Sequence, residues 1–188
     1  MRSFAFSAAV AAAIAIAAPP AVAADWSVDH TQSTLGFVFT QGGNPVTGAF
    51  TEFDAEITFD PADLAGAHVM VTVNIASIST GDGGRDTQAR GGQWFDVGQF
   101  ATATFEASTF TPGVVEGAYI AAGDLTLRGV RQAIELPFSL VIDGDTASVD
   151  GEVVLNRGTF GVGQGDFQSG TPIALDVTVT VDLVATRL

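Results

Sequence analysis

The segment from Ile173 to Ala185 alternates apolar and polar residues almost without interruption, and this alternation constrains the fold more than any other feature of the chain. Successive side chains of a β-strand point to opposite faces, so the odd positions are expected to share one face. These odd positions are Ile173, Leu175, Val177, Val179, Val181, Leu183 and Ala185. A strand this long with one apolar face must lay that face on a large interior. Because most of the chain repeats the pattern, that interior is the first candidate for a functional site.

The first residues have the three parts of a secretory signal peptide. Arg2 precedes an alanine-rich apolar run, and two prolines and the small-residue sequence Ala21-Val22-Ala23 follow it. A basic start, an apolar stretch and a small-residue cleavage site are typical of such a signal. We therefore expect residues 1–23 to be removed, residues 24–188 to form one domain, and the protein to be periplasmic.

Charge and cysteine content exclude several classes of function. The chain carries 21 acidic and 7 basic residues, a formal net charge of −14, and no cysteine. A strongly negative field repels nucleic acid and anionic lipid headgroups. The lack of thiols rules out disulfides, thiolate catalysis, iron–sulfur clusters and cysteine zinc sites. A domain of this size must then rely on an apolar core for its stability.

Segments that alternate like strands, divided by glycine- and proline-marked turns, fill most of the remaining chain. They cover residues 33–40, 46–59, 69–75, 102–111, 118–127, 133–142, 146–155 and 173–186. Within 46–59 the inward parity switches near Thr51 and Glu52, which we interpret as a β-bulge. Residues 85–95 lack alternation, and we expect a short helix or an irregular cap there.

These elements predict an all-β fold, an up-and-down antiparallel barrel of about eight strands. Ordinary strands run about 5–6 residues, whereas several of these segments are much longer. Long strands closed into a barrel of roughly eight strands leave an elongated interior with room for one ligand. A two-sheet sandwich filled with side chains is the alternative.

Residues that could support catalysis or bind a metal are scattered. His30 and His68 are the only histidines, and no Gly-x-Ser-x-Gly motif of a nucleophile elbow occurs. The closely spaced acidic pairs lie in turns, where aspartate is favoured for backbone hydrogen bonding alone. These pairs are Asp60 with Asp63, Asp82 with Asp86, and Asp143 with Asp145. We therefore expect no metal site and no enzyme activity.

Aromatic residues are concentrated on the inward parity of the expected strands. Together with Leu125, the candidate pore-lining residues are Phe37, Phe39, Phe50, Phe53, Phe59, Phe105, Tyr119 and Phe138. These rings either fill an ordinary core or line a tunnel and hold a long apolar chain by burial of its surface. The residues alone leave both interpretations open.

Several short motifs occur in the order found in a known family. The sequence Gly123-Asp124-Leu125-Thr126-Leu127-Arg128-Gly129 resembles the Gly-x-Leu-Thr-(apolar)-Arg-Gly signature of the YceI-like family. The other matching segments are Trp26 to His30 with Ser33, Gly48 to Phe53, Ser77 to Gly81 with Arg85-Asp86, Trp94-Phe95-Asp96, Phe100 to Phe105, and Phe160-Gly161. Two departures are Trp94, where the family has Phe, and Ala101, where it has Pro.

The resemblance implies an exported, extended antiparallel barrel of lipocalin-like shape. The pore of such a barrel is associated with a polyisoprenoid chain, a quinone tail or a fatty amide. We therefore expect the protein to carry a polyisoprenoid or isoprenoid quinone without a covalent cofactor. Family members often accompany membrane-embedded b-type cytochromes, so a quinone-linked redox or stress-response partner of such a cytochrome is one alternative. A ligand-free structural module is another. Long barrel strands are also compatible with a homodimer.

Arginines are scarce in this acidic chain, which suggests specific roles for them. We predict that Arg85 or Arg128 marks the mouth of the barrel and contacts the lipid headgroup, a pyrophosphate or a quinone oxygen. The competing interpretation is a salt bridge to Asp82, Asp86 or Asp124.

Overall fold

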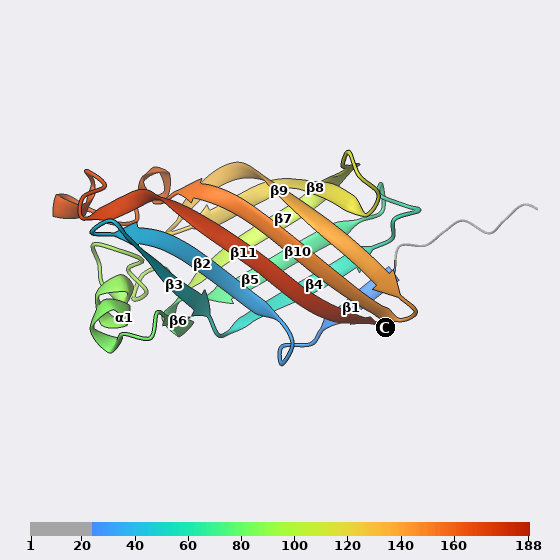
Figure 1. Cartoon of the computed structure of the whole chain (residues 1–188), viewed down its shortest axis with the longest axis horizontal. Coiled ribbons are helices and arrows are strands. Elements are labelled where there is room, and N and C mark those ends of the chain that lie inside the picture. The colour runs from blue at the N-terminus through green and yellow to red at the C-terminus, as the bar shows by residue number, and fades with distance from the viewer. Residues whose placement is uncertain (1–23) are drawn as a thin grey trace, which may run out of the picture.

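The computed structural model describes residues 24–188, and the expected signal peptide lies outside the described residues. The described chain is mostly antiparallel β-structure with one short α-helix (Figure 1). The strands are β1 (Ala24–Val28), β2 (Thr34–Gln41), β3 (Asn44–Phe50), β4 (Phe53–Phe59), β5 (His68–Asn74), β6 (Ile78–Ser79), β7 (Thr102–Pro112), β8 (Ala118–Leu127), β9 (Val130–Asp143), β10 (Thr146–Asn156) and β11 (Ile173–Arg187). The helices are η1 (Ile75–Ser77), α1 (Gly83–Arg90), η2 (Arg157–Phe160) and η3 (Gly165–Phe167).

The strands close into an eight-stranded antiparallel barrel, as the alternation predicted. β11 pairs with β1 near its C-terminal end and with β2 along the rest. β1 and β2 therefore occupy one strand position of the barrel between them, and we call such an interrupted strand a broken path. The other two broken paths are β3 with β4, and β5 with β6. β7 to β11 are continuous and pair in sequence order. Closure leaves each long strand with one face toward a common interior.

The parity switch at Thr51 and Glu52 marks a break between two strands, so its interpretation as a β-bulge was wrong. β3 ends at Phe50, paired with Ile78, and β4 begins at Phe53, paired with Val73. The extra residues lie in the neighbouring path, where η1 interrupts the chain between β5 and β6. The register between β3 and β4 therefore changes because the neighbouring segment between β5 and β6 forms a turn. The regular strand alternation begins again at Phe53.

The two ends of the barrel differ. Helix α1, the β2–β3 hairpin and the connection of residues 157–172 lie at one end, the cap end (Figure 1). The hairpins β4–β5, β7–β8 and β9–β10 lie at the opposite end with the C-terminus, and we call this the far end. No helix within residues 24–188 is long and apolar enough to cross a membrane.

Candidate functional site: an apolar cavity in the barrel

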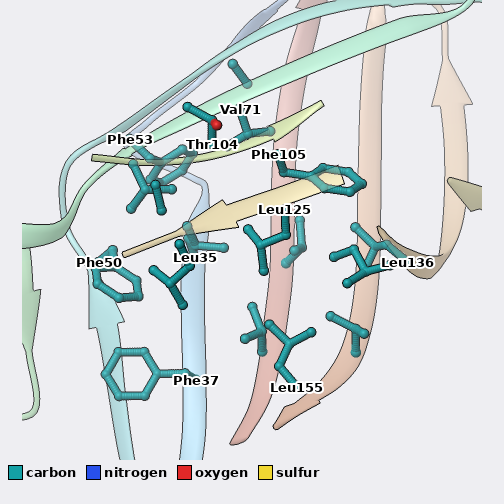
Figure 2. Close-up of a pocket in the computed structure, with 18 of the residues that line it drawn as sticks. Leu35, Phe37, Phe50, Phe53, Val71, Thr104, Phe105, Leu125, Leu136 and Leu155 are labelled. Atoms are coloured by element: carbon teal, nitrogen blue, oxygen red, sulfur yellow. The ribbon is translucent and has the colours of Figure 1, made fainter. Parts of the chain in front are cut away.

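A cavity of about 310 Å³ occupies the barrel interior. Figure 2 shows side chains from several strands directed into it, among them Phe50 of β3, Leu125 of β8 and Leu136 of β9. Its wall is aliphatic and aromatic except for Thr80, Arg85, Gln88, Thr104 and Arg157. The volume is within the range of about 300–1,000 Å³ that is usual for small-molecule sites.

Burial along the barrel shows that the middle of the interior is open. Inward side chains in the middle, such as Phe105 and Leu125, are only partly buried although they line the cavity. Inward side chains near the two ends, such as Phe59 at 6% exposure and Phe160 at 2%, are buried. A fully packed core would bury all of these positions to the same degree. The inward residues therefore form two packed ends around an unfilled middle.

Aromatic packing closes the far end. The ring of Phe59 lies edge-on to Phe110 and Tyr119, with centroids 5.3 and 5.4 Å away, and 6.0 Å from Phe138. The indole N–H of Trp26 donates a hydrogen bond of 2.9 Å to the main-chain oxygen of Phe59. Edge-to-face rings at these distances attract one another beyond their buried area. This cluster is the floor of the cavity.

Arg157 holds the connection between β10 and β11 over the cap end. Arg157 is 5% exposed, and its guanidinium donates hydrogen bonds to the main-chain oxygens of Ala174, Val162, Gly163, Phe167 and Ile173. It also lies 5.0 Å from the ring centre of Trp94, within range of a cation–π contact. Burial lowers the pKa of Arg157, but an arginine remains protonated in proteins. The charge is thus dispersed over carbonyl dipoles.

Helix α1 is a polar element placed beside this apolar space. Its N-cap residue, Asp82, accepts a 2.9 Å hydrogen bond from the main-chain N–H of Arg85. At the other end of the helix, Arg90 donates to the main-chain oxygens of Ala76 and Ile78. Because α1 contains few apolar side chains, burial of apolar surface contributes little to its position. The N-cap and these hydrogen bonds position it instead.

The mouth of the cavity lies beside α1. Gln88 is the one lining residue that is also exposed to solvent among residues 24–188. Arg85 precedes it by three positions, which places both side chains on the same side of the helix. Arg85 is partly buried and also lines the cavity.

The structure places eight of the nine predicted pore residues on the cavity wall. They are Phe37, Phe39, Phe50, Phe53, Phe59, Phe105, Leu125 and Phe138. Tyr119 is the exception. Its ring stacks on Phe138 and contacts Phe59, so it supports the floor from behind and does not reach the open space. Their role as lipid contacts stays a prediction.

The two arginines predicted to mark the mouth are separated. Arg128 occupies a two-residue turn with Gly129, and both have positive φ, 51° and 73°, as a type I′ turn requires. From there it donates a 2.8 Å hydrogen bond to the Gly92 oxygen and approaches Asp96 at 4.0 Å. It is therefore a contact between the β8–β9 turn and the cap, and only Arg85 reaches the cavity.

Neither histidine lines the cavity. His30 packs edge-on against Phe53, with ring centroids 5.3 Å apart. The Nε2 atom of His68 lies 3.6 Å from a carboxylate oxygen of Glu106, with both side chains substantially exposed.

The predicted pore residues were nearly all aromatic, so they left out much of the cavity wall. Of the 45 residues of the wall, 28 are aliphatic, including Leu35, Leu136 and Leu155. The strand parity alone would have located these three leucines. Trp94, Phe160 and Arg157 at the cap end follow no strand alternation, so they become neighbours only through the tertiary fold. Leu175 has the inward parity but lies beside Gly170 in the β10–β11 connection, near a register shift between β11 and β2.

Comparison with known proteins agrees with this architecture. Residues 26–185 match the YceI-like domain. The chain belongs to the YceI-like family. A UPF0312 protein of Shewanella oneidensis is 34% identical over 148 residues, 77% of this chain and 76% of that protein. One of Ectopseudomonas mendocina is 34% identical over 128 residues, 66% of each chain.

Two solved structures share the fold of this YceI-like protein. The crystal structure of BcnA from Burkholderia cenocepacia has a TM-score of 0.81 and 33% identity, covering 85% of this chain and 99% of that one. A polyisoprenoid binding domain from Saccharophagus degradans, implicated in plant cell wall breakdown, has a TM-score of 0.71 and 18% identity. It aligns over 88% of this chain and 99% of its own.

Proposed function

We propose that this protein binds and carries a long apolar lipid, a polyisoprenoid or the tail of an isoprenoid quinone, inside its barrel in the periplasm. The observation that carries the proposal is the elongated cavity with a nearly continuous apolar wall, closed at the far end and reached beside α1. Such a space suits one extended apolar chain with its polar end at the mouth.

Burial of the chain can supply the affinity. Each CH₂ group removed from water contributes about 0.8 kcal/mol, so a long tail gains several kcal/mol before the costs of ordering and association. The wall needs no dense set of polar groups for this purpose, and it has few. The Saccharophagus degradans domain of the same fold, named for polyisoprenoid binding, supports the choice of ligand class.

The first experiment identifies what the native protein carries. The protein is purified from its own periplasm without detergent, extracted with organic solvent, and the extract is analysed by mass spectrometry. A stoichiometric isoprenoid or quinone is the expected result. An empty extract, together with no uptake of an isoprenoid alcohol such as geranylgeraniol by the folded protein, would overturn the proposal.

Two neighbouring valines of β10 provide a matched test of the site. Val153 lines the cavity, whereas Val154 points outward and is 59% exposed. Val153→Phe should fill part of the open space and reduce uptake of geranylgeraniol. Val154→Phe adds the same side chain to the outer surface and should leave uptake unchanged. Equal uptake by both variants would place the lipid outside the cavity.

A further inference from the structure

The pairing between β9 and β10 ends halfway along the barrel. From their shared hairpin at the far end (Figure 1), the two strands pair only as far as Phe138 with Gly151. Beyond this pair β9 remains paired with β8, and β10 with β11, up to the cap-end tip of each strand. We call the unpaired interval, residues 130–137 of β9 and 152–156 of β10, the seam.

Main-chain polar groups of β9 face the seam without a strand partner. The N–H of Leu140 donates to the oxygen of Gly117, the residue before β8. Because successive N–H groups of a strand point to opposite sides, the odd-numbered residues of β9 face β10. Pro137 is the first of these beyond the last pair, and it has no N–H to donate. Glu135 and Ala133 follow, and both are exposed, so water can satisfy their main-chain groups.

The exposure of Gln132 shows that solvent reaches the inner face of β9 at the seam. Gln132 is paired with Leu125, which lines the cavity, so both side chains lie on the inward face. The other inward positions of β9 are buried or partly buried, whereas Gln132 is exposed. On its cap side, Val130 packs against the cluster that contains Phe160. Solvent therefore contacts Gln132 from the side of β10.

Apolar side chains that belong to the cavity wall border the seam on both sides. All four are partly buried, and Figure 2 labels one from each strand. They are Ile134 and Leu136 of β9, and Val153 and Leu155 of β10. The seam is therefore continuous with the apolar interior.

The charges beside the seam oppose its closure. Glu135 and Glu152 are exposed on the outer face, one on each strand. Continuing the β9–β10 register would make them diagonal neighbours across the seam, where like charges repel. Neither residue belongs to an ion pair within residues 24–188. Electrostatic repulsion therefore adds to the loss of the Pro137 donor in keeping the two strands apart.

We propose that the seam is a lateral portal, through which the apolar chain of the lipid enters and leaves the cavity between β9 and β10. The inference rests on the proposed function, because it assigns a route to the same cavity. The two ends of the barrel are obstructed, by the connection that Arg157 holds and by the rings around Phe59. A chain entering only beside α1 would have to be threaded along the axis. A side opening lets many carbons exchange water for the apolar wall together.

The test closes the seam with a covalent bridge. The chain contains no cysteine, so two introduced thiols define a single cross-link. Glu135→Cys with Val154→Cys places one thiol on each side, because the continued register sets these positions opposite each other. Val141→Cys with Ser148→Cys is the matched control, since these residues are opposite in the paired part of the same two strands. Each pair is bridged with a bismaleimide in the purified mature protein.

The rate constants for uptake and release of geranylgeraniol are measured before and after bridging. We expect the bridge across the seam to lower both by at least about tenfold and to leave the dissociation constant nearly unchanged, because it obstructs the route and not the bound state. The control bridge should leave both rates unchanged. Unchanged rates with the seam bridged, or equal slowing by the two bridges, overturns the portal and leaves lipid carriage standing. No uptake by wild-type protein rejects both.

Hydrogen exchange tests the seam without any substitution. The amide of Glu135 faces the seam, whereas that of Leu136, the next residue, faces β8. In lipid-free protein we expect Glu135 to exchange much faster than Leu136. Equally slow exchange at the two amides would mean that β9 and β10 are paired there, and would overturn the inference.

Discussion

The carboxylate of Asp86 accepts two hydrogen bonds from Thr80, one from the main-chain N–H at 2.9 Å and one from the hydroxyl at 2.6 Å. Asp86 is 8% exposed, so this pair joins α1 to the segment after β6 at a site shielded from water. The helix that borders the cavity mouth is therefore held by a buried polar contact, and its stability depends on that contact.

Replacing Asp86 should loosen this attachment. Asp86→Ala leaves the Thr80 N–H without an acceptor, and we expect a loss of about 1–3 kcal/mol in the free energy of unfolding. Urea denaturation measures this loss, and hydrogen exchange should rise within residues 80–90. Asp166→Ala, at an exposed position, is the control and should change stability by less than about 0.5 kcal/mol. Equal effects of the two substitutions would contradict the role of Asp86.

Removing the Arg157 guanidinium should be more costly. Arg157→Met leaves several buried main-chain oxygens without donors, for which we expect a loss of about 3 kcal/mol or more. Hydrogen exchange should increase across residues 157–172. The same change at Arg131, whose ion pair with Asp124 is exposed to solvent, should cost much less, because exposed ion pairs contribute little to stability. If the two substitutions cost the same, Arg157 does not hold the cap end.

Two phenylalanines test whether the middle of the barrel is open. Phe59 is buried among other rings, so Phe59→Ala creates a cavity and should cost about 3–5 kcal/mol. Phe105 is partly buried against space that is already open, and Phe105→Ala should cost at least about 1 kcal/mol less. The measurement is the free energy of unfolding of each variant in the absence of lipid. A larger loss at Phe105 would indicate a packed middle.

Asp29 should contribute a pH-dependent term to stability. Hydrogen bonds from the side chains of Thr31 and Gln32, and from the Thr31 main-chain N–H, lower the pKa of Asp29 to about 2. Its ionised form is therefore favoured in the folded state, so its contribution is complete above the unfolded pKa of about 4 and is lost as the pH falls toward 2.

The measurement is the difference in unfolding free energy between wild type and Asp29→Asn at pH 7 and at pH 2.5. We expect a smaller difference at the lower pH. Asp150→Asn, an outward substitution on β10, should show no such change. A carboxyl resonance of Asp29 that titrates near pH 4 in the folded protein would refute the prediction.

Much of the barrel could be predicted from local patterns. The alternation from Ile173 to Ala185 reappears as β11, whose inward residues Val177, Val179 and Val181 line the cavity. The motif order identified the family, and the matching residues 26–185 confirm it. The expectation of a short helix or cap in residues 85–95 was met by α1 and the turns that follow it. The prediction failed where a neighbouring strand set the geometry. The β-bulge expected near Thr51 is a break between β3 and β4, beside the point where η1 separates β5 from β6.

The sequence by itself determined which side of each strand faces inward, because side-chain alternation is a property of the strand's own backbone. Only the tertiary structure decided whether that inward face is packed or open. The space between Phe105, Leu125 and their neighbours depends on how eight strands close, which no local pattern records. The same reason separates Arg85 from Arg128. Both arginines lie next to glycines in family motifs, and only the placement of α1 beside the cavity makes Arg85 a residue of the cavity wall.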